Sequence, residues 1–133
     1  MTGTGRRRTW LAVAAVAVVA AGLAVSRGDG LAADLGGGAL YTCLVYVLVA
    51  LVAPLARPWT VGATALAVSI AVELAQLTHL PRDVVAQVPL AHYVLGTTFA
   101  PTDLLAAAAG AALATAVDLT ARARVSDRAP RPA

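Results

Sequence analysis

The sequence predicts an all-α protein: a membrane-embedded bundle of four transmembrane helices, with an interfacial segment between the third and fourth. The first observation is the composition, because 59% of the 133 residues are hydrophobic and only 13% are charged. Soluble domains are about half apolar and about a quarter charged. The second observation is that the apolar residues gather in four stretches of near-spanning length. These features exclude a soluble globule, whose small core could not hold so much apolar surface, and a disordered chain.

The first two stretches cover residues 10–25 and about 40–56, and neither contains a charged residue. Residues 36–39 could lengthen the second stretch at its start. Pro54 falls near its end, where a lost backbone hydrogen bond costs little. Between the two stretches, the sequence SRGDGLAADLGGG is rich in glycine and acidic residues. We expect this segment to be a flexible loop.

The third stretch covers residues 60–80, and the fourth covers about 103–121. The third contains one charged residue, Glu73, and the fourth contains Asp118 near its inner end. Neither shows a polar face wide enough for a helix on the surface of a soluble protein. We therefore expect both stretches to cross the membrane.

The connection between these two stretches, residues 81–101, differs from the others. It contains three prolines and the apolar sequence VPLAHYVLGTTF. Aromatic side chains such as Tyr93 and Phe99 suit the boundary between membrane and water. We expect an interfacial or partly re-entrant segment.

The arginines predict the orientation. All 10 basic residues are arginine, and an even number of spans places both termini on one side. That side would be cytoplasmic, since cytoplasmic loops are enriched in basic residues. The predicted organisation is a basic cytoplasmic N-terminus (1–9), a transmembrane domain (10–121) and a disordered basic cytoplasmic tail (122–133), in a bacterial inner membrane. Eight arginines would then lie inside and two outside: Arg6, Arg7, Arg8, Arg57, Arg122, Arg124, Arg128 and Arg131 against Arg27 and Arg82.

Two alternatives concern the basic ends. A basic start followed by a short apolar run also fits a secretory or twin-arginine signal peptide, with cleavage near Ala20 or Ala24. Basic termini can also bind nucleic acid. Here each arginine cluster directly abuts an apolar run, so we expect no nucleic-acid partner. Cleavage of the first stretch stays open.

Three polar residues of the third stretch share one helix face. Ser69, Glu73 and Gln76 are spaced i, i+4 and i+7, which aligns them at about 100° per residue. A carboxylate within a membrane costs roughly 2–3 kcal/mol even on a lenient scale, and such residues normally face the bundle interior. The stripe predicts either a polar pocket that opens outward above Glu73, or an interhelical hydrogen bond donated by a neutral Glu73. Ser69 alone also suits close helix contact.

Asp103 stands at the start of the fourth stretch. An acidic residue there can cap free backbone N–H groups and suits the positive end of the helix dipole. Small residues follow on the same face, at Ala107, Gly110 and Ala114. They would allow another helix to approach closely. We expect the fourth helix to pack on the third and to place Asp103 above Glu73.

Motifs for metals, cofactors and covalent catalysis do not stand out. His79 and His92 fall near the outer boundary without a recognisable zinc-ligand spacing. A glycine-rich phosphate loop and a nucleophile elbow are also missing from the sequence. We expect neither a metal nor a cofactor.

The second half of the chain resembles a family of small bacterial membrane proteins catalogued as domain of unknown function number 2809. The resemblance rests on AVELAQL, YVLGTTF and TDLLAAAAG, and more distantly the chain is similar to the VanZ-like family, in which Ser69 also fits. The VanZ-like resemblance implies a role in the cell envelope. The family pattern would have an arginine near Ala86 and Gln87, where the nearest basic residue is Arg82. The matching residues are Glu73, Gln76, Leu95, Gly96, Phe99, Asp103, Leu104, Leu105 and Gly110.

Three functions remain open from the sequence. The first is a non-enzymatic envelope protein whose pocket, built from Ser69, Glu73, Gln76 and Asp103, holds a lipid or a lipid-linked envelope ligand. The second is a small membrane enzyme that uses Glu73 and Asp103 as an acid–base pair on a lipid-linked substrate. Helix rise alone would separate these carboxyl groups by roughly 10 Å in depth. The third is a structural or interaction subunit, with membrane lipids and further copies of the chain as partners.

Overall fold

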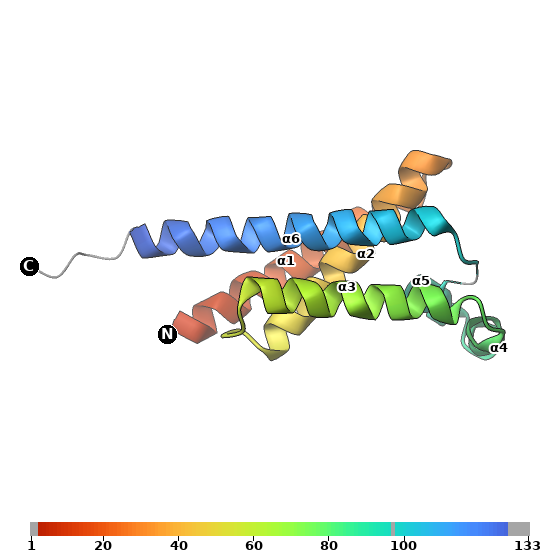
Figure 1. Cartoon of the computed structure of the whole chain (residues 1–133), viewed down its shortest axis with the longest axis horizontal. Helices are drawn as coiled ribbons and strands as arrows, with labels where there is room; N and C mark the ends of the chain where they lie inside the picture. Colours follow the sequence, from red (N-terminus) through yellow and green to blue (C-terminus); the bar gives the residue numbers. More distant parts are fainter. Residues whose placement is uncertain (1–2, 97, 128–133) are drawn as a thin grey trace, which may run out of the picture.

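The computed structural model describes residues 3–96 and 98–127 and confirms the all-α prediction. No strand occurs within those residues, and four long helices dominate the fold (Figure 1). All four are long and apolar enough to cross a membrane. The four are α1 (Gly3–Val25), α2 (Leu31–Val52), α3 (Pro58–Ala75) and α6 (Pro101–Asp127).

The segment between α3 and α6 folds into three short helices at one end of the bundle (Figure 1). They are α4 (Leu80–Gln87), the 3-10 helix η1 (Pro89–Ala91) and α5 (His92–Leu95). A proline stands in the first turn of α4 and of η1, where the absent N–H costs no helical hydrogen bond. We call the end of the bundle that holds α4, η1 and α5 the pocket end. The opposite end, which holds Arg7, Pro54 and Arg122, is the arginine end.

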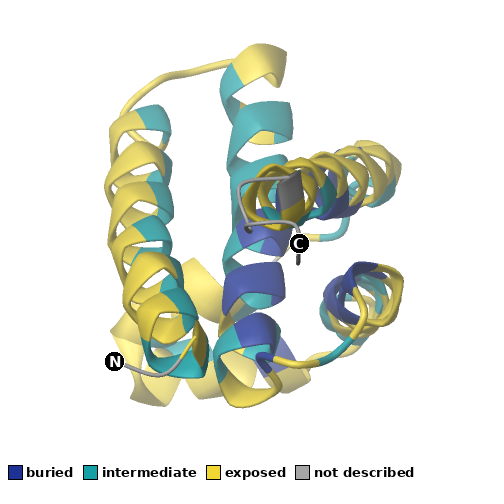
Figure 2. Cartoon of the chain, turned by 90° about the vertical axis from the view of Figure 1, so that its left-hand side faces the viewer, coloured by how far each residue is buried: buried dark blue, intermediate teal, exposed yellow. Residues whose placement is uncertain are grey.

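Helix α2 is the centre of the bundle. It packs against α1, α3 and α6, and α3 also packs against α6. Helix α1 lies on the far side of α2 and contains no buried residue (Figure 2). The core of Tyr46, Ala50, Val61 and Ala65 therefore lies between α2, α3 and α6.

Large apolar side chains point away from this core on every long helix. Val16 is 71% exposed, Val52 83% and Leu105 71%. In water, such a surface would drive association, but lipid chains would cover it in a membrane. The exposure pattern thus agrees with the membrane-protein fold.

The small-residue face of α6 contacts α2, whereas we expected it to contact α3. Gly110 lies so close to the backbone of Ala39 that a Cβ atom would overlap the Ala39 carbonyl oxygen. One turn earlier, Ala106 contacts α2 at Gly38. Helix α6 packs on α3 further along, where Thr115 meets Gly62. The stripe predicted a close approach correctly, but its partner is the central helix.

Asp118 is the most heavily hydrogen-bonded side chain at the arginine end. Arg7 donates to its two carboxylate oxygens over 2.9 and 3.0 Å, and Arg122 donates over 3.2 and 3.1 Å. The Tyr46 hydroxyl donates a further bond of 2.8 Å. Two-pronged arginine–carboxylate pairs are strong and geometrically specific. This network joins α1, α2 and α6 around one buried carboxylate.

The same two arginines also satisfy the backbone between α2 and α3. Arg7 Nε donates to the carbonyl oxygen of Pro54, and an Arg122 guanidinium nitrogen donates to that of Ala56, both over 2.9 Å. Carbonyl groups that follow a helix end lack intrahelical partners. The tight connection before Pro58 is therefore held by charged side chains from the first and last helices.

One helix boundary differs from the sequence-based expectation at the pocket end. Helix α2 begins at Leu31, so Gly36, Gly37 and Gly38 lie within a helix and the expected flexible loop shrinks to a short turn. The reason is tertiary packing. Gly36 contacts Val25 of α1 on one side of the helix, and Gly38 contacts Ala106 of α6 on another.

Two more differences occur at the arginine end. Helix α1 begins at Gly3, which places the three N-terminal arginines on the helix. Helix α6 continues to Asp127, beyond residue 121 where we expected a disordered tail. The hydrogen bonds that Arg122 donates to Asp118 and to the carbonyl oxygen of Ala56 explain this extension in part. Residues 128–133 of that tail lie outside the described residues.

The network predicts unequal effects of neighbouring arginine substitutions. Arg122→Gln and Arg7→Gln should each lower the free energy of unfolding by roughly 1–3 kcal/mol, because each removes charge-assisted hydrogen bonds to Asp118. The exposed Arg124→Gln and Arg8→Gln variants, which make the same charge change, should stay within about 0.5 kcal/mol of wild type. Titration with SDS in mixed micelles, followed by circular dichroism, measures this. An equal loss of stability in Arg122→Gln and Arg124→Gln, and likewise in Arg7→Gln and Arg8→Gln, would contradict the network's role.

Candidate functional site

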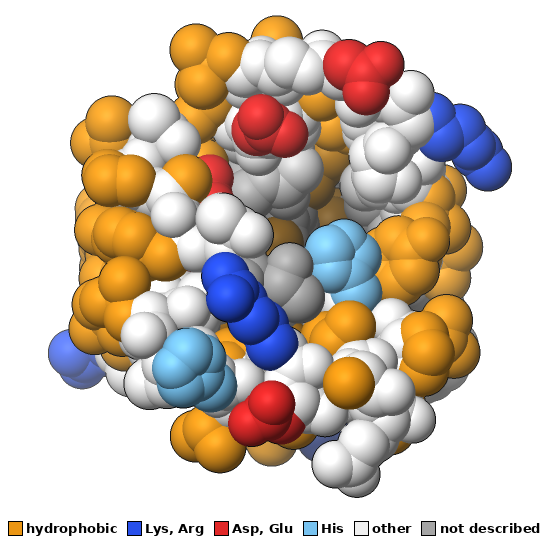
Figure 3. Space-filling view, turned by 90° about the vertical axis from the view of Figure 1, so that its right-hand side faces the viewer, with side chains coloured by type: hydrophobic (Ala, Val, Ile, Leu, Met, Phe, Trp, Pro, Cys, Tyr) orange, Lys and Arg blue, Asp and Glu red, His pale blue; other side chains and the backbone are white. Residues whose placement is uncertain are grey.

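A pocket of about 670 Å³ lies at the pocket end, among α1, α2, α3, α5 and the start of α6. This end of the molecule is hollowed, with acidic side chains, histidines and basic side chains around the hollow (Figure 3). All four residues that the sequence singled out for a polar site line this pocket: Ser69, Glu73, Gln76 and Asp103.

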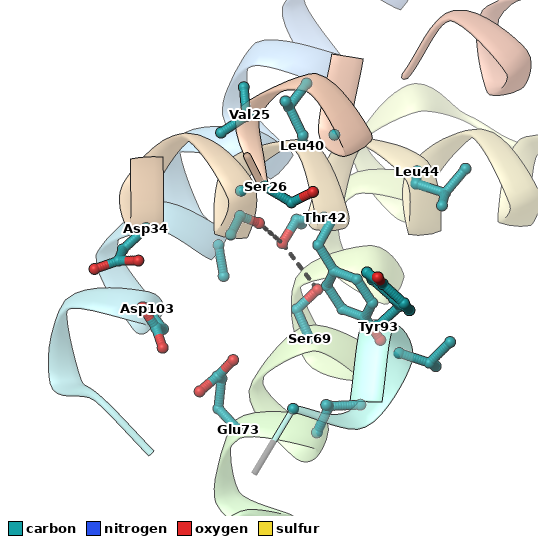
Figure 4. Close-up of a pocket in the computed structure, with 18 of the residues that line it drawn as sticks. Val25, Ser26, Asp34, Leu40, Thr42, Leu44, Ser69, Glu73, Tyr93 and Asp103 are labelled. Atoms are coloured by element: carbon teal, nitrogen blue, oxygen red, sulfur yellow. Dashed lines mark hydrogen bonds between the residues drawn. The ribbon is translucent and has the colours of Figure 1, made fainter. Parts of the chain in front are cut away.

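Ser69 lies at the inner limit of the pocket. Its hydroxyl group is hydrogen-bonded to that of Thr42 on α2 over 2.9 Å, and both residues are buried (Figure 4). Thr42 also lies 3.3 Å from the carbonyl oxygen of Gly38, a turn earlier in α2. Ser69 therefore links α3 to the central helix as well as lining the pocket.

Glu73 stands one turn beyond Ser69, and its carboxyl group points toward Asp103 (Figure 4). Its Oε2 atom is buried and has no hydrogen-bond partner among the described residues. Buried polar atoms nearly always have one. Of the two alternatives that the sequence leaves open, the interhelical hydrogen bond is thus not made by this oxygen within the described residues, and Glu73 lines the pocket.

Gln76 connects α3 to the end of α5. Its side-chain amide donates to the carbonyl oxygen of Leu95 over 2.8 Å, whereas its own oxygen, Oε1, is buried and has no hydrogen-bond partner within residues 3–96 and 98–127. Gly96 follows in the left-handed region at a φ of 61°. A Cβ there would lie 2.6 Å from the Gln76 amide nitrogen, so the site favours glycine on two grounds. The contact joins two motifs that are distant in the sequence.

Two carboxylates from different helices approach the pocket near Glu73. Asp103 lies in the first turn of α6 and Asp34 in the first turn of α2, positions where a helix dipole favours negative charge. Both line the pocket, and Figure 4 shows them on the same side of it as Glu73. Capping and pocket-lining are therefore compatible roles for Asp103.

The other predicted residues lie around the pocket. Phe99 is half-buried and Gly110 packs against α2, and neither lines the pocket. His92 lines the pocket, whereas His79 is exposed outside it. Within residues 3–96 and 98–127, no group of three histidine, cysteine or acidic side chains could hold a metal ion.

A family model described as "Protein of unknown function (DUF2809)" matches residues 27–111. The chain belongs to the DUF2809 family. The match contains the four predicted pocket residues together with Gly96, Phe99 and Gly110. No curated protein and no solved structure matches the chain.

Several lining residues of this DUF2809 protein were missed from the sequence. Asp34 falls in the segment that the sequence predicts to be a flexible loop, and Tyr93 is expected only at the membrane boundary. No sequence pattern singles out Tyr41 or Thr42. Only Asp34 has a hint in the sequence to its place at the pocket. It falls in the same polar segment as the glycines that become part of α2. The pairing of Thr42 with Ser69 crosses 27 residues and has no local signature.

The pocket of the DUF2809 protein has two chemically different sides. One side carries the three carboxyl groups and the amide oxygen of Gln76, which all accept hydrogen bonds. The other side is formed by apolar residues of α1 and α2: Val18, Val19, Leu23, Val25, Leu40 and Leu44. Such a lining can hold a molecule that has both a polar and an apolar part.

Proposed function

We propose that this DUF2809 protein binds an amphipathic ligand of the cell envelope, with the polar group of the ligand in the pocket. The observation that carries the proposal is the pair of buried oxygens, Glu73 Oε2 and Gln76 Oε1, which lack hydrogen-bond partners among the residues that the structure describes. An unpaired buried acceptor costs about 1–3 kcal/mol. A ligand that supplies donors would remove this cost.

The arrangement of the helices supports access from the membrane. Helix α1 packs chiefly on α2 and meets α6 at the arginine end through Arg7 and Asp118 (Figure 2), whereas its later residues line the pocket opposite Glu73. The opening between α1 and α3 would allow the apolar part of a ligand to stay among lipid chains. The polar part would then enter without crossing the hydrocarbon region.

The cellular setting is part of the proposal. The resemblance to VanZ-like proteins favours a bacterial protein of the cell envelope. The arginine distribution favours both termini in the cytoplasm and the pocket end facing outward. Two observations support this topology. Four helices are compatible with crossing a membrane, and both described chain ends lie at the arginine end (Figure 1).

This topology predicts the behaviour of C-terminal fusions in a bacterial host. Green fluorescent protein fused after residue 133 should be fluorescent, and alkaline phosphatase at the same place should be inactive. Each reporter works on only one side of the membrane. Inactive fluorescent protein together with active phosphatase would reverse the proposed orientation.

Pocket occupancy can be tested by native mass spectrometry of protein purified from bacterial membranes. Gly37 lines the pocket, and a Cβ there would meet no atom within 4 Å. Gly37→Leu should therefore fill space without disturbing the fold, since leucine is also a better helix former. We expect a bound small-molecule mass on the wild type that falls at least about tenfold in Gly37→Leu.

A matched control separates occupancy of the pocket from general lipid binding. Ala71 is exposed on α3 and does not line the pocket, so Ala71→Leu places the same leucine side chain outside the pocket. This variant should keep the bound mass. A wild type without any bound mass, or equal binding by all three proteins, would overturn the proposal.

A small membrane enzyme is the second candidate, favoured by the carboxyl groups of Glu73 and Asp103 pointing toward one another (Figure 4). Such a pair could transfer protons on a lipid-linked substrate. In that case Glu73→Gln and Asp103→Asn would retain substrate and stop its conversion. Conversion by both variants at the wild-type rate would exclude this role.

A further inference from the structure

We infer that the polar group bound in the pocket is a protonated amine, and that the ligand is an alkyl-chain amphiphile with an ammonium head group. The inference rests on the proposed function and specifies its ligand class. It combines three observations: the charges that line the pocket, the two unpartnered oxygens, and an apolar groove that continues from the pocket.

The charges of the lining favour a cation. Asp34, Glu73 and Asp103 come from three helices and all line the pocket. Among the described lining residues there is no arginine or lysine. Ionised carboxylates only accept hydrogen bonds, and near lipid a charge interacts more strongly than it does in water. A phosphate group would meet like charge from all three carboxyl groups of this lining.

The unpartnered oxygens call for donors at defined places. Gln76 uses its amide group to hold Leu95, so its buried oxygen is left to accept. Glu73 Oε2 lies three residues earlier on α3, on the same helix face. An ammonium group carries three N–H donors and no acceptor. It could therefore serve both oxygens at once, whereas a hydroxyl group has a single proton to donate.

The apolar groove supplies a place for the alkyl chain. A second hollow of about 480 Å³ runs along α1 and α2, and every residue that lines it is apolar. It shares Val19, Leu23 and Leu44 with the main pocket. From Ala15 to Leu23 the groove follows α1 for about 12 Å. A chain attached to a head group at Glu73 would leave the pocket along this groove.

Hexadecylamine, hexadecanol and hexadecyl phosphate test the inference, because they share one chain and differ only in the head group. Their affinities for full-length protein in neutral maltoside micelles can be measured by native mass spectrometry. We expect the amine to bind at least about tenfold more tightly than either other probe, as one charge-assisted hydrogen bond would give. Glu73→Gln should remove most of that preference.

Asp29→Asn is the matched control. Asp29 is exposed at the same end of the molecule but does not line the pocket, so its loss tests the general surface charge. This variant should keep the amine preference. Asp103→Asn provides a second pocket variant in case Glu73→Gln fails to fold, and helical circular dichroism checks both.

The outcomes separate the inference from the proposed function. Tighter binding of the alcohol or the phosphate, sensitive to Gly37→Leu, would overturn the amine head group while keeping an amphiphile-binding pocket. Binding of all three probes that is insensitive to Gly37→Leu would overturn both. An equal loss of amine preference in Asp29→Asn and Glu73→Gln would also overturn the inference, since surface charge alone would then explain it.

Two sources share this ligand chemistry: an aminolipid of the cell itself and a cationic amphiphile that arrives from outside. Mass analysis of molecules that copurify with the protein distinguishes them. An amine-bearing lipid present on the wild type and lost in Glu73→Gln identifies the endogenous source. Binding of added hexadecylamine without any copurifying amine identifies the external one.

Discussion

A carboxyl group on an apolar helix must turn away from lipid, and this constraint organises both ends of the bundle. Asp118 and Glu73 obey it in opposite ways. Asp118 is surrounded by two arginines and a tyrosine that use both of its oxygens. Glu73 keeps a buried oxygen that has no hydrogen-bond partner in the part of the chain that the structure describes. A fully bonded buried carboxylate fixes structure, whereas an unbonded one at a pocket leaves room for a ligand.

The two ends of the bundle therefore differ in role. At the arginine end, Arg7 and Arg122 bind Asp118 and the carbonyl groups of the α2–α3 connection, so the first and last helices are fixed where they meet. At the pocket end, α1 and α3 both line the pocket, and the chain between α3 and α6 is held by the contact of Gln76 with Leu95. A rigid base beneath a more open end suits a protein that admits a molecule from the membrane.

The sequence predicted what local patterns determine. Hydropathy located the four helices, and the spacing of Ser69, Glu73 and Gln76 predicted one inward face. Prediction from the sequence failed where contacts between distant segments determine the structure. The glycines at 36–38 looked like a loop because glycine weakens isolated helices, but α1 and α6 pack against them. Asp118 and Arg7 are 111 residues apart, so no periodicity could pair them. The same holds for Thr42 with Ser69.

The inward orientation of Glu73 is the central claim, and cysteine accessibility along α3 tests it most directly. In a Cys43→Ala background, single cysteines at Glu73 and Gln76 should react with a membrane-impermeant maleimide added to intact cells. Cysteines at Ala71 and Leu74, which lie at similar depth but are exposed outside the pocket, should stay unmodified among lipid chains. Modification of the second pair and protection of the first would place Glu73 against lipid and contradict the account.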